Sequence, residues 1–179
     1  MPPLESILSN LARAQKELLR AADNVPLEYW KTRPNEKAWS AAEVVAHLII
    51  VERGIIATAD RVTQEEPKEF PLWKRFHLPM MLVEARVVRR KTPVPLNPEM
   101  VREKEDMLAE LRTVRERTLA FVDETRGREL SAYCWRHPFL GTMNVYEWLQ
   151  MIASHEVRHT KQIREIAADL PKVIEGLQK

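Results

Sequence analysis

The chain has 179 residues, of which 28 are Lys or Arg and 26 are Asp or Glu, so its formal net charge is only +2. Apolar residues make up 45% and charged residues 30%, which excludes a wholly disordered chain and leaves no excess of basic residues for nucleic acid. The single cysteine excludes an internal disulfide and a cysteine-based metal site. The length suits one domain with a proper core, so residues 1–179 are expected to form a single domain.

The sequence shows no targeting or membrane-spanning segment. The opening residues, MPPLESILSN, have neither the basic region nor the apolar stretch of a secretory signal. The longest nearly uncharged apolar run, residues 38–51, is too short to cross a bilayer and includes Glu43 and His47. We therefore expect a cytoplasmic protein that interacts with no membrane and no nucleic acid.

Five helical segments are expected from apolar residues that recur every three or four positions and from the residues that begin and end each run. In chain order they are Leu4 to Ala22, Ala41 to about Thr63, a shorter one at about Pro79 to Arg90, Pro98 to about Glu124, and Asn144 to about Asp169. Ser40 with Glu43, and Asn144 with Glu147, have the spacing of a capping box. Asn97 is expected to cap the fourth segment, and Pro171 to limit the fifth.

The segments between these helices are expected to be loops. Residues 128–143 are irregular and aromatic, and no stretch of the chain shows the strict alternation of a half-buried strand. Four glycines against twelve prolines also suit helices joined by proline-rich connections. The predicted fold is all-α, a four-helix bundle with an additional short helix.

The second helical segment is apolar around almost its whole circumference. Val45, Ile49 and Ile56 lie roughly opposite the stripe that contains His47. These residues must be covered by another helix, by the loop at residues 25–39, or by a second subunit. A homodimer through this helix is our first expectation.

His155 and His159 are the most informative pair in the sequence. A spacing of four places both imidazoles on one face of a helix, one turn apart, where they can share a metal ion. Their stripe also contains Trp148, Ile152, Ile163 and Ile166, so both histidines should point into the bundle. His47 lies on the apolar stripe of another helix. If these two helices are neighbours, His47, His155 and His159 form a three-histidine metal site with open coordination positions.

Other interpretations of the histidines remain open. Each can be an ordinary core histidine that is hydrogen-bonded to a carbonyl or carboxylate, although the spaced pair and the third inward histidine favour a metal. His77 and His137 lie close to prolines in loops and are assigned no site.

Residues 155–159 spell HExxH, the zinc-peptidase signature, in which Glu156 would be the general base. The longer peptidase signature needs Gly at the position of Gln162 and His at that of Glu165, so this alternative is disfavoured.

Two segments resemble a known family. The run AWSAAEVVAHLIIVE is similar to the second-helix segment of the DinB-like superfamily of metalloenzymes. The run HPFLGTMNVYEWLQMIASHEVRHTKQIREI resembles the final segment of that family, where HxxxH is followed by glutamine and isoleucine. The resemblance implies an up-down-down-up four-helix bundle, usually dimeric, with a divalent metal held at the positions of His47, His155 and His159. The superfamily includes transferases and isomerases that use low-molecular-weight thiols.

The favoured function is a metal-dependent transferase or hydrolase, in which zinc or nickel activates water or a low-molecular-weight thiol for attack on a small electrophilic substrate. Glu156 is a candidate proton acceptor beside His155, although an exposed, solvated side chain is an equally good interpretation. Gln162 and Arg158 are weaker candidates for a polar lining residue and an anion-binding residue, and Cys134 is expected to be an inert thiol. The alternative function is a non-catalytic, stress-related metal-binding or dimerisation module.

Overall fold

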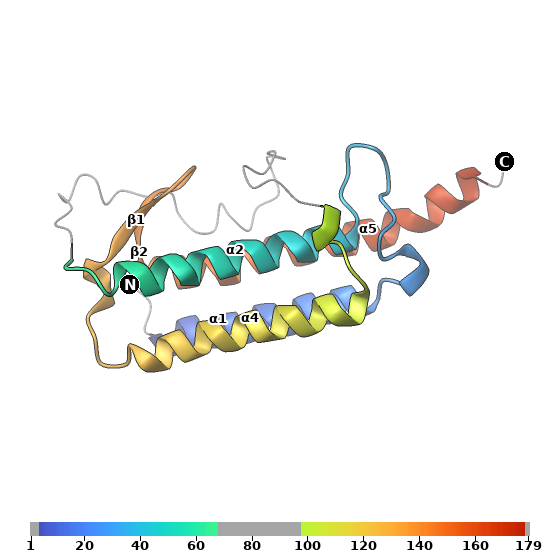
Figure 1. Cartoon of the computed structure of the whole chain (residues 1–179). Coiled ribbons are helices and arrows are strands. Elements are labelled where there is room, and N and C mark those ends of the chain that lie inside the picture. Colours follow the sequence, from blue (N-terminus) through green and yellow to red (C-terminus); the bar gives the residue numbers. More distant parts are fainter. Residues whose placement is uncertain (1–3, 68–97, 178–179) are drawn as a thin grey trace.

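The computed structural model describes residues 4–67 and 98–177 and contains four long helices that lie side by side (Figure 1). These are α1 (Leu4–Asp23), α2 (Ala41–Val62), α4 (Lys104–Glu124) and α5 (Val145–Leu177). In Figure 1, α1 and α5 run in one direction and α2 and α4 in the other, which is the up-down-down-up order. Helix α5 packs against α1 and α2, and α2 packs against α4. The predicted four-helix bundle is confirmed.

Capping residues fix the starts of the two helices that matter most for the site. The Ser40 hydroxyl accepts a hydrogen bond from the Glu43 amide at 3.2 Å, and the Glu43 carboxylate accepts one from the Ser40 amide at 2.8 Å. At the start of α5, Asn144 and Glu147 exchange the same pair of bonds at 2.7 and 3.0 Å. Both predicted capping boxes are therefore present, and each satisfies amides that the first helical turn leaves unpaired.

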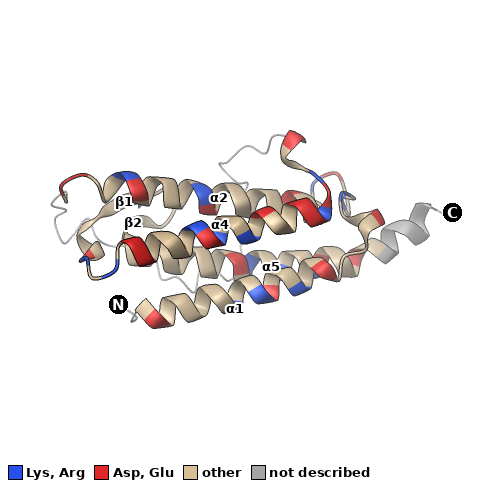
Figure 2. Ribbon diagram, turned by 60° about the horizontal axis from the view of Figure 1, so that its bottom comes forward, with Lys and Arg blue, Asp and Glu red and all other residues tan. Residues whose placement is uncertain are grey.

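Both faces of α2 are buried within the chain itself. Val45, Ile49 and Ile56, opposite the His47 stripe, are all almost fully buried in the core that the four helices share. Of the three covers expected for this face, the structure shows the first, because the chain's own helices bury it and leave no need for a second subunit there. Figure 2 shows Lys and Arg interspersed with Asp and Glu along the helices, without a long run of one sign.

A short β-hairpin replaces part of the loop expected at residues 128–143. Strand β1 (Cys134–His137) pairs antiparallel with β2 (Gly141–Asn144), and Trp135 lies opposite Met143. Each strand has only four residues, too few for alternation to be visible in the sequence. The turn uses Gly141 at φ +100°, a conformation that side-chain-bearing residues rarely adopt.

Two helix boundaries also differ from those expected. Pro98–Met100 forms a separate 3-10 turn, and α4 begins only at Lys104, after the extended residue Glu103. Helix α5 continues past Pro171 to Leu177, because a proline removes one main-chain donor without obliging the helix to end. Two further 3-10 helices occur at Leu27–Tyr29 and Leu130–Ala132. The short helix expected at Pro79 to Arg90 lies outside the described residues.

Among the residues that the structure describes, no helix is both long and apolar enough to cross a membrane.

Candidate metal centre

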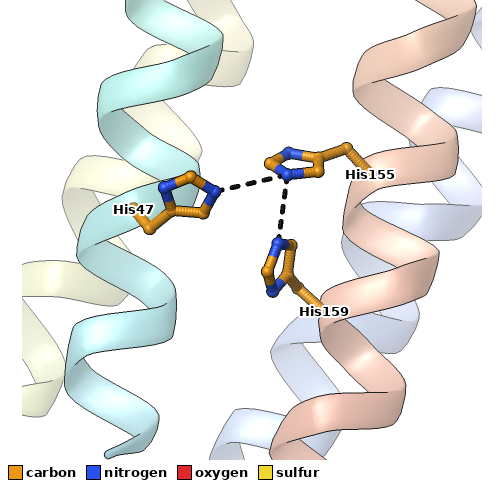
Figure 3. A group of neighbouring side chains, drawn as sticks. All are labelled: His47, His155 and His159. Atoms are coloured by element: carbon orange, nitrogen blue, oxygen red, sulfur yellow. Dashed lines mark hydrogen bonds between the residues drawn. The ribbon is translucent and has the colours of Figure 1, made fainter. Parts of the chain in front are cut away.

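Three histidines meet between α2 and α5 (Figure 3). His47 extends from α2, and His155 and His159 extend from successive turns of α5. The Nε2 atom of His155 lies 3.3 Å from Nε2 of His47 and 3.0 Å from Nε2 of His159. One ligand atom from each ring lies within 4.8 Å of the other two. The structure thus brings together the three histidines that the sequence singled out.

The surrounding residues keep this cluster largely away from solvent. His47 and His159 are buried, and His155 is partly exposed. The ring of Trp39, just before the start of α2, lies 5.2 Å from the His47 ring between centroids. Trp39 was not predicted from the sequence to contact His47, which lies eight positions later.

Gln162 fixes the protonation of one ring. Nδ1 of His159 lies 2.9 Å from the amide oxygen of Gln162, which can only accept a hydrogen bond. In the tautomer that matches this amide orientation, Nδ1 carries the proton and Nε2 presents its lone pair to the cluster. Outer partners of this kind commonly hold metal-binding histidines in the correct tautomer. Gln162 thus has a definite contact where the sequence suggested only a lining residue.

Burial also keeps the other two rings uncharged. Loss of hydration lowers the pKa of His47 to about 4. Burial, and then any charge on His159 and His47, holds the pKa of His155 well below its usual range. At neutral pH both imidazoles therefore carry a nitrogen lone pair, which is the form that binds metals.

The two short contacts in the cluster also match the spacing of imidazole nitrogens that share a metal ion. With metal–nitrogen bonds of about 2.0–2.1 Å, two imidazole nitrogens lie about 3.3 Å apart at a tetrahedral angle and about 2.9 Å apart at a right angle. The observed separations of 3.0 and 3.3 Å fall in this range.

Glu156 is not a solvated residue, so that interpretation of the sequence was wrong. Its side chain is only 1% exposed, and Oε2 lies 2.9 Å from Nη2 of Arg115 on α4. Since the carboxylate is occupied by this guanidinium, the structure gives no support to Glu156 as the general base of an HExxH peptidase. Neither Arg115 nor Glu52, which binds it, was recognised from the sequence.

The remaining candidates lie apart from the cluster. Nδ1 of His137, in the hairpin, accepts hydrogen bonds from the amides of Phe139 and Leu140, each at 3.1 Å. The Cys134 thiol lies 3.6 Å from the Ser131 carbonyl. Among the described residues, His137 and Cys134 are not part of the metal-binding group. His77 lies outside these residues, and Arg158 is only partly buried.

Comparison with known proteins agrees with the fold and identifies the family. The chain is 29% identical over 136 residues to YuaE, an uncharacterized protein of Bacillus subtilis (strain 168), which corresponds to 75% of this chain and 80% of that protein. The crystal structure of TT2238, a four-helix bundle protein, superimposes with a TM-score of 0.59 at 20% identity and covers 90% of this chain and 98% of that one. The model of the DinB superfamily matches residues 10–163. The chain therefore belongs to the DinB superfamily.

Proposed function

We propose that His47, His155 and His159 hold one divalent metal ion, zinc or nickel, and that the protein is a metal-dependent transferase or hydrolase. The observation that carries this proposal is the convergence of one ring nitrogen from each of three histidines within 4.8 Å. Imidazole suits both zinc and nickel, and no carboxylate or thiolate accompanies the three nitrogens among the described residues. Three protein ligands leave room for a further ligand, as in catalytic sites.

Three neutral ligands leave the charge of a bound ion uncompensated, which lowers the pKa of a water or thiol that it binds and supplies a nucleophile at neutral pH. The protein's own contribution is to hold the three lone pairs on one point. Gln162 orients His159, and Trp39 shields His47. The proposed substrate is a small electrophile, with water or a low-molecular-weight thiol as the second reactant.

Metal analysis of the purified protein tests the binding step. We expect about one zinc or nickel ion per chain, and loss of stoichiometric binding in His155→Ala and in His159→Ala. His137→Ala is the matched control, because that histidine is partly buried against Trp148 but lies outside the cluster. Full metal content in the His155→Ala/His159→Ala double variant would remove the assignment.

An activity screen tests the catalytic step. The metal-loaded protein is assayed with low-molecular-weight thiols and small electrophiles, and with activated esters for hydrolysis. Metal-dependent turnover that is absent in His155→Ala is the expected result. Stoichiometric metal without turnover would favour the non-catalytic metal-binding module instead. Cleavage of casein that disappears in Glu156→Gln would favour the peptidase.

We also propose a homodimer, on the strength of the family resemblance. Val45 and Ile49, on the back of α2, are buried within the chain, so this face is not an argument for the dimer. Light scattering at micromolar concentration should report twice the chain mass, and a monomer would contradict the proposal. Because Ile49 is buried within one chain, we do not expect Ile49→Glu to disrupt the dimer without also affecting the fold.

A further inference from the structure

A buried ionic cluster lies in the bundle beside the histidines. The Arg115 guanidinium, on α4, donates to both carboxylate oxygens of Glu52, on α2, at 2.7 and 3.0 Å. It also donates to the Leu11 carbonyl, on α1, at 2.8 Å, and lies 2.9 Å from the carboxylate of Glu156, on α5. All four helices therefore meet at one guanidinium, and the three charged side chains are at most 3% exposed.

Stability alone does not account for this cluster. Removing charges from water costs about as much as their attraction returns, so buried ion pairs replaced by well-packed apolar residues often leave a protein equally or more stable. Two carboxylates face one guanidinium, and neither oxygen of Glu156 receives an aligned hydrogen bond. The cluster instead fixes the relative positions of its side chains, because a planar guanidinium donates hydrogen bonds only in fixed directions.

The two carboxylates lie on the same helices as the three histidines. Glu52 is five positions after His47 on α2, and Glu156 lies between His155 and His159 on α5. One guanidinium therefore sets how far α5 can slide along α2. A slide of one residue moves a side chain by about 1.5 Å, whereas metal–ligand distances tolerate only about 0.2 Å.

We propose that Glu52, Arg115 and Glu156 are positioning residues that hold α2 and α5 in the register at which the three imidazoles converge. The assignment of the histidines as metal ligands rests on the proposed function. The register of α2 against α5 is a property of the metal-free chain. Glu156 thus acts on the site through the helix that carries it, and not as a proton acceptor.

The test is the variant Glu52→Met/Arg115→Met/Glu156→Met, which removes all three charges at once. It leaves no buried donor stranded, because the Thr118 hydroxyl, which donates to Glu52 at 2.7 Å, also reaches the Val114 carbonyl at 3.2 Å. The matched control is Asp60→Asn/Arg117→Met, which breaks an exposed pair joining the same α2 and α4 at 2.7 Å.

Two readouts separate positioning from stability. In metal-free protein labelled at histidine, the nuclear Overhauser contact between the His47 and His155 rings, whose centroids are 5.0 Å apart, is recorded beside the melting temperature. In metal-loaded protein, the dissociation constant is measured with zinc. We expect the triple variant to keep or raise its melting temperature, to lose the ring contact, and to bind zinc about tenfold or more weakly. The control should retain both the contact and the affinity.

The outcomes are distinguishable. If the triple variant keeps the ring contact and the wild-type affinity, the cluster is merely structural and the proposal falls. If the wild type shows the ring contact but binds no metal, the proposed function fails while positioning is judged by the contact alone. Should the triple variant not fold, Glu156→Met, which removes the α5 partner and leaves Arg115 paired with Glu52, replaces it. The same loss of contact is then expected, and an unchanged contact overturns the proposal.

Discussion

The core of this bundle contains two polar clusters, the three histidines and the ionic cluster around Arg115. They differ in how their buried polar atoms are paired. At the histidine cluster, three ligands of the uncharged type, the imidazole rings, bring their Nε2 atoms together from two helices. At the Arg115 cluster, full charges of opposite sign face each other and bind through directional contacts. In the proposed function a cation from outside the chain completes the first arrangement, whereas the chain itself largely completes the second.

The comparison teaches which cluster the fold depends on. A buried neutral imidazole costs less free energy than a buried unpaired charge, so the histidine cluster can be altered with less damage to the fold. The two clusters should therefore differ in experiments: replacing a histidine removes a proposed metal ligand, whereas breaking the Arg115 cluster asymmetrically destabilises the fold.

The largest loss of stability is expected from replacing Arg115 alone, the positively charged member of the ionic cluster. Arg115→Met leaves the Glu52 and Glu156 carboxylates buried without their partner, which should lower the free energy of unfolding by about 3–5 kcal/mol. Urea denaturation of the metal-free protein measures this. His155→Ala, in the other cluster, should cost clearly less, and an equal loss in the two variants would erase the distinction between them.

The pH dependence of stability should have opposite signs at the two clusters. Burial lowers the pKa of His47 to about 4, so the unfolded chain binds more protons between pH 6.5 and 4, and this term loses stability as the pH falls through that window. Burial first, and then the charge of Glu52, raise the pKa of Glu156 to about 7 against the pull of Arg115. The folded chain then binds the extra proton between pH 4.5 and 7, and this term loses stability as the pH rises.

Glu156→Gln isolates the second term, because glutamine does not ionise. Relative to the wild type, the metal-free variant should gain stability steadily as the pH rises from 4.5 to 7 and no further above that. Denaturation curves at several pH values measure the difference. A difference that stays constant with pH would show that Glu156 titrates normally.

A smaller effect is expected at the histidine cluster when Gln162, the partner of His159, is replaced. Gln162→Leu removes the acceptor that holds the proton of His159 on Nδ1, so zinc should bind about tenfold more weakly, with little change in melting temperature. Gln162→Glu, which keeps an acceptor at that position, should retain most of the affinity. Equal weakening in both variants would show that the tautomer is not the cause.

The smallest effect is expected at the surface. The Asp60–Arg117 pair joins the same two helices as Glu52 and Arg115 but is 32% and 43% exposed. Asp60→Asn should lower the free energy of unfolding by only about 0.2–1 kcal/mol, and less at high salt. A loss as large as that of Arg115→Met would show that burial is not what distinguishes the two pairs.

The sequence predicted the bundle and the meeting of the histidines because both follow from periodicity. Four-residue spacing placed His155 and His159 on one stripe, and the capping boxes located the starts of α2 and α5. The hairpin was missed because four-residue strands are shorter than the alternation signal, and the end of α5 because a proline was taken as a stop.

The ionic cluster was missed for a different reason. Single charged residues on a helix are usually solvated, and periodicity does not show that Glu52, Arg115 and Glu156 face one another. A signal was present in α2, where Glu52 lies on the same helical stripe as the buried residues Ile49 and Ile56. A charge on an apolar stripe needs a buried partner, but nothing local in the sequence identifies Arg115 as that partner.

The separation of the histidines along the chain has a kinetic consequence. His47 and His155 are 108 positions apart and belong to α2 and the last helix, so their pairing requires most of the chain to be in place. Closing so long a segment is slow, and the complete set of ligands exists only once α5 has docked. A metal ion that needs all three imidazoles therefore binds after the rate-limiting step of folding. It should prolong the lifetime of the folded protein by slowing unfolding, while the rate of folding stays as it is without metal.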